Sequence, residues 1–150
     1  MRKGSVYMSK STPIQIHVLS EIRNEKDLDK EQIEVRTKGE FILKGKTSYI
    51  RYEEEHELGF VKTTVKIAEN EVVVMRTGAV VMKQRFIKGM VTATEYTTPY
   101  GRLQLATNTH SLSHVTENRQ GKLVLQYDLQ IDEKEKHVHT LMMTYKEEQS

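Results

Sequence analysis

The feature that most constrains this chain is an alternation of apolar and polar residues with a period of two, which recurs along almost the whole sequence. In the segment TPIQIHVLSEIR, for example, Ile14, Ile16 and Val18 alternate with polar neighbours. Successive side chains of a β-strand point to opposite faces, so this period is typical of strands that bury one face. We predict roughly ten such strands, over residues 12–23, 33–45, 46–55, 60–68, 72–76, 79–86, 90–97, 102–115, 122–131 and 137–145.

Short turns separate these segments, and no stretch has the length and period of a normal helix. The clearest turn is TPYG, in which Pro99 and Gly101 fit a type I turn. A series of antiparallel strands must protect its edges, and closure into a barrel removes them, while a two-sheet sandwich is the competing solution. Gly39 lies in the middle of a predicted strand and therefore indicates a bend or a bulge.

Composition limits the class of protein. With 150 residues, 37% hydrophobic and 29% charged, the chain fits one soluble domain with its own core. The absence of cysteine excludes disulfides, zinc–thiolate sites and cysteine nucleophiles, and it fits a reducing compartment. The basic opening is not followed by an apolar run, so we expect no signal peptide, no membrane span and a cytoplasmic location. We predict a flexible tail over residues 1–11 and one barrel domain over residues 12–147.

Several motifs together resemble one family. YEEEHELG, VKTTVKI, MRTGAVVMKQRF, TPYG and the closing HVHTLMMTY are similar to the YwiB-like family of uncharacterised β-barrel proteins from Gram-positive bacteria. The resemblance covers nearly the whole chain. It implies a calycin-like fold, similar to lipocalins and fatty-acid-binding proteins, and no assigned activity. The predicted fold class is therefore all-β: a single antiparallel calycin-like barrel of roughly 8–10 strands.

Polar residues on the apolar faces of the strands are the candidate site. In a barrel the apolar face points inward, so polar residues that share it line the interior. Gln84 alternates with Met82 and Phe86, whereas Arg76 faces inward only if Val72 and Val74 do. An interior that mixes apolar side chains with an arginine fits a small amphipathic or anionic ligand. The tentative ligand-binding residues are Arg76, Gln84, Tyr52, Tyr127 and Tyr96, the last if Met90 faces inward.

Two alternatives remain open at this point. An inward Arg76 can simply pair with an inward Glu54 in a barrel filled by its own side chains. The outer surface would then bind a protein partner, a second copy of the chain or RNA. A net charge of +2 does not favour nucleic acid, although outward strand positions carry a basic stripe. An open cavity of more than about 300 Å³ favours the ligand. The stripe comprises Lys62, Lys66, Lys83, Arg85 and Lys88.

Metal and catalytic motifs give little support to an enzyme. His137 and His139 share a strand face, and His110 and His114 form a second pair, but neither pair has an aligned third ligand. The acidic run of residues 53–57 is more typical of a solvated hairpin than of a cation site. Motifs of serine hydrolases, phosphate-binding loops and zinc proteases are absent from the sequence. We therefore predict a non-catalytic protein with no metal site and no cofactor.

Overall fold

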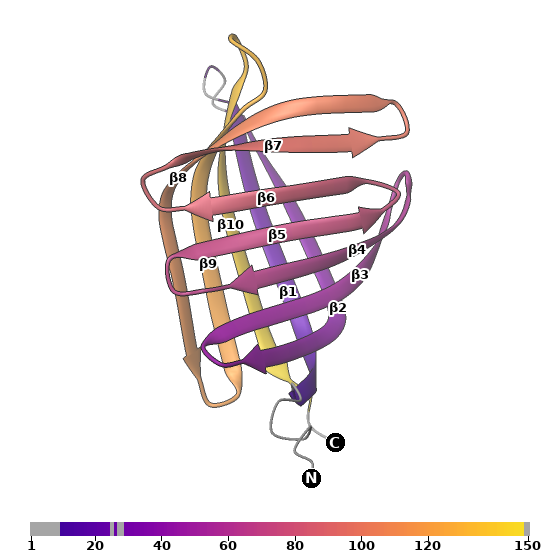
Figure 1. Ribbon diagram of the computed structural model, residues 1–150, viewed down its shortest axis with the longest axis vertical. Coiled ribbons are helices and arrows are strands. Elements are labelled where there is room, and N and C mark those ends of the chain that lie inside the picture. The colour runs from indigo at the N-terminus through magenta and orange to yellow at the C-terminus, as the bar shows by residue number, and fades with distance from the viewer. Residues whose placement is uncertain (1–9, 25, 27–28, 149–150) are drawn as a thin grey trace.

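Ten antiparallel strands close into one barrel in the computed structural model, which describes residues 10–24, 26 and 29–148 (Figure 1). Each strand pairs with its neighbours in sequence, and β1 also pairs with β10 to complete the ring. The predicted all-β antiparallel barrel is confirmed. The strands are β1 (Lys10–Asn24), β2 (Lys30–Lys44), β3 (Thr47–His56), β4 (Gly59–Ile67), β5 (Glu71–Gly78), β6 (Val81–Ile87), β7 (Val91–Thr98), β8 (Gly101–Glu117), β9 (Gln120–Gln130) and β10 (Lys136–Glu147).

The boundaries of the predicted domain can be compared with the first and last strands of the barrel. β1 begins at Lys10, two residues before the predicted start of the barrel, and β10 ends at Glu147. Most of the predicted tail, residues 1–9, lies outside the described residues. Within the described part of the chain, the structure contains no apolar helix with the length that a membrane crossing requires.

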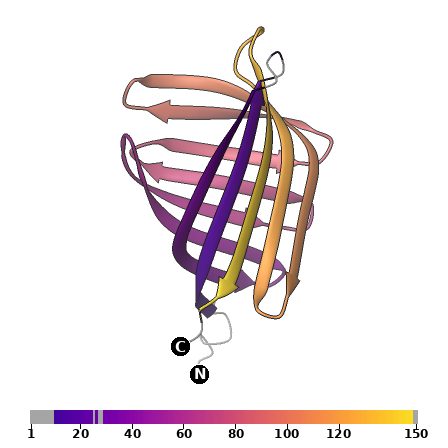
Figure 2. The ribbon, with the colours of Figure 1, turned by 180° about the vertical axis from the view of Figure 1, so that it is seen from behind.

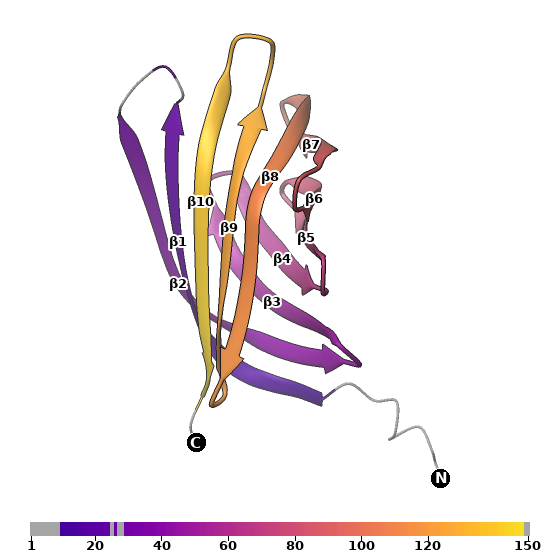
Figure 3. The same cartoon turned by 90° about the vertical axis from the view of Figure 1, so that its left-hand side faces the viewer.

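The barrel is flattened into two layers that cross. Seen from behind, the long strands β2, β1, β10, β9 and β8 run side by side (Figure 2). Strands β3 to β7 form the opposite layer, which lies in front of the long strands in Figure 1 and beside them in the side view (Figure 3). The inward faces interdigitate into a core in which Ile14, Ile50, Leu123 and Leu125 are buried. Burial of about 25 cal/mol per Å² of apolar surface is the main driving force for this arrangement.

The predicted irregularity at Gly39 is a bend, by which β2 passes from one layer to the other. β2 pairs with β1 along residues 30–43 and begins to pair with β3 at Gly39, opposite Tyr52. A Cβ added at Gly39 would lie 2.2 Å from the backbone oxygen of Arg51 and 2.7 Å from Cδ1 of Ile16. Glycine is therefore required here by close approach of the neighbouring strand.

An irregularity that the sequence did not reveal lies in β8. Thr109 is opposite Tyr127 and Ser111 is opposite Gln126, so His110 is an extra residue in the ladder. Because of the extra residue, the positions that face inward before the bulge and after it differ in parity. The inward face changes from the odd-numbered positions to the even-numbered ones, which include Leu112 and His114.

The seam between β6 and β7 has few hydrogen-bonded pairs. Its register joins only Val81 to Thr97 and Met82 to Tyr96, among the described residues. A side chain adds one further hydrogen bond between these strands: the Thr92 hydroxyl of β7 donates to the Arg85 carbonyl of β6 at 2.6 Å. Beneath the seam, Gln84 Nε2 of β6 donates to Thr107 Oγ1 of β8 at 2.9 Å.

Candidate functional site

A cavity of about 490 Å³ lies inside the barrel, and all ten strands contribute side chains to its wall. Its volume falls within the range of about 300–1,000 Å³ that is usual for small-molecule sites. Valine, leucine, isoleucine, methionine and phenylalanine make up most of the wall. All of the predicted ligand-binding residues line this one cavity: Arg76, Gln84, Tyr52, Tyr127 and Tyr96.

Arg76 points inward because β5 presents Val72, Val74 and Arg76 on the same face. Its side chain is 31% exposed, and Nη2 lies 3.9 Å from Oε1 of Glu54. The same Glu54 oxygen accepts a hydrogen bond from the Thr63 hydroxyl at 3.3 Å. The ion pair with Glu54 that the sequence left open is therefore present, beside an open cavity. Nε of Arg76 is buried and has no hydrogen-bond partner among the described residues.

Two buried phenols lie near this ion pair. Burial raises the pKa of Tyr52 to about 12, with a further contribution from the Glu54 charge that Arg76 opposes. Burial also raises the pKa of Tyr127 to about 12, and Arg76 again acts in the opposite direction. Both hydroxyls therefore remain protonated at neutral pH, and each can donate one hydrogen bond and accept others.

His139 is a cavity residue that the sequence did not identify as a ligand contact. Its ring stacks on Tyr127 at 4.8 Å between centroids, and Nδ1 lies 3.4 Å from the Tyr127 hydroxyl. Burial, followed by the His137 charge, lowers the pKa of His139 to about 4, against an opposing effect of Asp128. The ring is therefore neutral at pH 7. Nε2 is buried and has no partner among the described residues, and it carries the hydrogen when the Tyr127 hydroxyl donates to Nδ1.

The remaining predicted residues are less free to bind a ligand. Gln84 donates one amide N–H to Thr107, which leaves its second N–H and its carbonyl oxygen for other partners. Tyr96 is half-buried and lies opposite Met82 across the weak seam. Two buried threonine hydroxyls, Thr94 and Thr109, have no partner among the residues that the structure describes.

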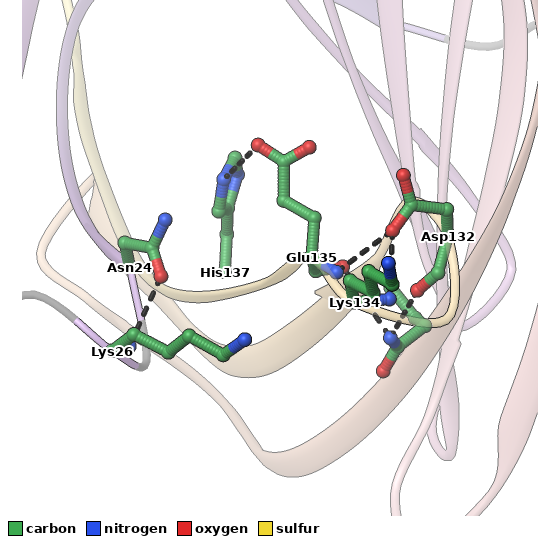
Figure 4. Close-up of polar contacts among 7 residues, drawn as sticks. Asn24, Lys26, Asp132, Lys134, Glu135 and His137 are labelled. Carbon is green, nitrogen blue, oxygen red and sulfur yellow. Dashed lines mark hydrogen bonds and ion pairs between the residues drawn. The ribbon is translucent and has the colours of Figure 1, made fainter.

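One end of the cavity lies near two exposed aliphatic side chains and an ordered turn. Ile33 of β2 and Leu103 of β8 line the cavity and are 44% and 52% exposed. At this end, Asp132 accepts hydrogen bonds from the backbone of Lys134 and Glu135, each at 2.8 Å (Figure 4). These contacts hold the β9–β10 turn next to Ile131, which also lines the cavity.

The histidine pairs do not converge on a metal site. His137 pairs with Glu135 at 3.3 Å (Figure 4), and its ring lies 6.2 Å from that of His139. The β8 bulge separates the other pair, because His110 contacts Asp128 at 2.8 Å on the outer face and His114 contacts the Tyr145 hydroxyl at 2.8 Å. Among the described residues, no group of three or more histidine, aspartate or glutamate side chains is placed to hold a metal ion.

The outer surface carries the basic residues, but acids accompany them. In the predicted stripe, Lys62 pairs with Glu53 at 3.9 Å and Arg85 pairs with Glu71 at 2.5 Å. A wider recess of about 880 Å³ crosses the outer faces of β2, β1, β10, β9 and β8. It includes Lys38, which pairs with Glu148 at 3.4 Å. These ion pairs weaken the attraction of the outer surface for a polyanion, so the cavity inside the barrel is the stronger candidate site.

The buried imidazole predicts a pH dependence of stability. The pKa of His139 lies near 4 in the folded chain, against 6.5 for an unperturbed histidine. Between these values the unfolded chain binds the extra proton, so the free energy of unfolding falls as the pH decreases through this window. We expect wild type to lose about 2 kcal/mol more than His139→Phe between about pH 7 and pH 5.

Urea unfolding at the two pH values measures this difference. His114, whose pKa is also lowered by burial, contributes with the same sign in both proteins and cancels in the comparison. Equal losses in wild type and His139→Phe would contradict the neutral state assigned to His139.

Comparison with known proteins places the chain in a family. Residues 16–143 match the family described as "Domain of unknown function (DUF1934)". The chain is 42% identical over 138 residues to "Uncharacterized beta-barrel protein YwiB" of Bacillus subtilis (strain 168). The aligned region covers 92% of this chain and 96% of the relative. The crystal structure of the ywiB protein from Bacillus subtilis is similar, with a TM-score of 0.87 at 39% identity over 99% of this chain and 100% of that one. The chain therefore belongs to the DUF1934 family of β-barrel proteins whose function is unknown.

Proposed function

We propose that this chain is a non-catalytic cytoplasmic protein that binds one small amphipathic or anionic ligand inside its barrel. The observation that carries the proposal is the cavity of about 490 Å³, whose aliphatic wall surrounds a polar group formed by Tyr52, Arg76, Tyr127 and His139. A ligand with an apolar body and a polar head matches both parts of this surface. The absence of cysteine supports the cytoplasmic location, because it fits a reducing compartment.

The unpartnered nitrogen atoms strengthen the argument for a ligand. A buried polar atom without a hydrogen bond costs about 1–3 kcal/mol, and native proteins have few of them. Arg76 Nε and His139 Nε2 are both of this kind, and both residues line the cavity. A ligand head that accepts hydrogen bonds from them offsets this cost, while its body replaces water along the aliphatic wall.

Native mass spectrometry of the protein purified from its own host tests the proposal. We expect wild type to carry a reproducible extra mass that Arg76→Ala lacks. Arg36→Ala is the matched control, because Arg36 lies on the outer face of β2 with a 71% exposed side chain. It should retain the mass.

A second variant guards against misfolding of Arg76→Ala. Tyr127→Phe removes only a hydroxyl, and we expect it to weaken ligand binding by about fivefold, the value of one hydrogen bond of about 1 kcal/mol. If wild type carries no mass, and Arg76→Ala has the same melting temperature as wild type, the proposal fails. A protein or RNA partner on the outer face would then be the function to test.

A further inference from the structure

We propose that the head group of the ligand is uncharged and accepts hydrogen bonds, because Arg76 is already paired with Glu54 in the wall of the cavity. This inference rests on the proposed function and narrows its ligand from amphipathic or anionic molecules to neutral ones. Suitable heads include amides, esters and alcohols. It also adds His139 to the residues that contact the ligand.

The charges around the cavity sum to zero. Arg76 supplies one positive charge and Glu54 one negative charge, with 3.9 Å between Nη2 and Oε1. Among the other titratable groups that line the cavity, Tyr52 and Tyr127 are protonated phenols and His139 is a neutral ring. His56 accepts a hydrogen bond from the Leu58 amide through Nδ1 at 3.1 Å, which requires that nitrogen to carry no proton.

An anionic head would disturb this balance. A carboxylate beside Arg76 would also lie close to the Glu54 carboxylate, and the two like charges would share a single guanidinium. Glu54 is only 22% exposed, so water screens this repulsion incompletely. The anion would therefore enter the cavity with a surplus negative charge in a mostly apolar wall, which disfavours its binding.

The hydrogen-bonding pattern of the cavity still calls for an acceptor. A guanidinium nitrogen donates and never accepts, so the free position at Arg76 Nε requires an oxygen or a similar acceptor. His139 Nε2 becomes a second donor when Nδ1 accepts from Tyr127. A carbonyl or hydroxyl oxygen satisfies such donors without adding charge, and the aliphatic wall contacts the rest of the ligand.

Isothermal titration of the full-length protein with decanamide and decanoate tests the choice of head. The two probes share an alkyl chain and differ in charge at neutral pH. We expect decanamide to bind at least about tenfold more tightly than decanoate. Tighter binding of decanoate would overturn the inference and leave the proposed function standing. Failure of both probes, and of their octyl and dodecyl counterparts, would overturn both.

Glu54→Gln makes the test sharper, because it leaves Arg76 uncompensated without removing volume. We expect the preference to reverse, with decanoate at least about tenfold tighter than decanamide. Glu53→Gln is the matched control: it is the neighbouring residue on β3, its side chain is 65% exposed, and it pairs with Lys62 on the outer face. It should keep the wild-type preference. An unchanged preference in Glu54→Gln, with the melting temperature retained, would overturn the inference.

Discussion

Replacing Phe86 by alanine is expected to reduce the free energy of unfolding by about 3–5 kcal/mol, which is the usual cost of removing a fully buried phenylalanine ring. Phe86 is 1% exposed, and its ring packs edge-on against Tyr127 with 4.7 Å between centroids. Because Phe86 also lines the cavity, its removal joins new empty space to the space already present. The structure can close that space only partly, which places the effect toward the upper part of the range.

Phe60→Ala is the matched control for this prediction. Phe60 is 71% exposed on β4, so the same substitution should change stability by no more than about 0.5 kcal/mol. Urea unfolding followed by circular dichroism measures both variants on one scale. A loss of less than about 1 kcal/mol in Phe86→Ala would show that the ring is not packed as described.

Gly39→Ala is expected to destabilise the barrel by about 2–3 kcal/mol, at the upper end of the range for overpacking. The added methyl group would lie 2.2 Å from the backbone oxygen of Arg51, and only a movement of β2 relative to β3 relieves that contact. This movement would disturb the bend by which β2 passes between the two layers. The side chain of Ile16, at 2.7 Å, must move as well.

A second glycine separates close contact from backbone conformation. Gly45 has a φ of +61°, but a Cβ added there would meet nothing within 4 Å. Gly45→Ala should therefore cost only about 1 kcal/mol, which reflects the left-handed backbone alone. Equal losses in the two variants, measured by urea unfolding, would contradict the role assigned to the Gly39 contact.

Much of the fold follows from local alternation. The period of two placed Tyr52, Gln84 and Tyr127 on inward faces, and each of them is buried there. Alternation is sufficient where one face of a strand is clearly apolar, because the hydrophobic effect then fixes its direction. It is insufficient in β5, where Val72, Val73 and Val74 are all buried, so the direction of its polar residues depends on register with the neighbouring strands.

The site was less predictable, because its contacts join residues that are distant in sequence. Arg76 meets Glu54 from two strands away, and His139 of β10 meets Tyr127 of β9. The segment HVHTLMMTY is partly apolar on both faces, so nothing local indicates that His139 faces inward. The β8 bulge is equally hidden, since His110 is an ordinary strand residue until its pairing with β9 is known.

The weak seam between β6 and β7 determines how the ring can open. Elsewhere the neighbouring strands share longer ladders, but among the described residues this seam has two paired positions and the hydrogen bond from the Thr92 hydroxyl to the Arg85 carbonyl. Separation of β7 from β6 therefore breaks fewer backbone hydrogen bonds than any cut through the long strands, and it exposes the cavity beside Gln84 and Tyr96. We therefore expect the amide protons of β6 and β7 to exchange with solvent faster than those of the long strands, because opening at this seam breaks the fewest backbone hydrogen bonds.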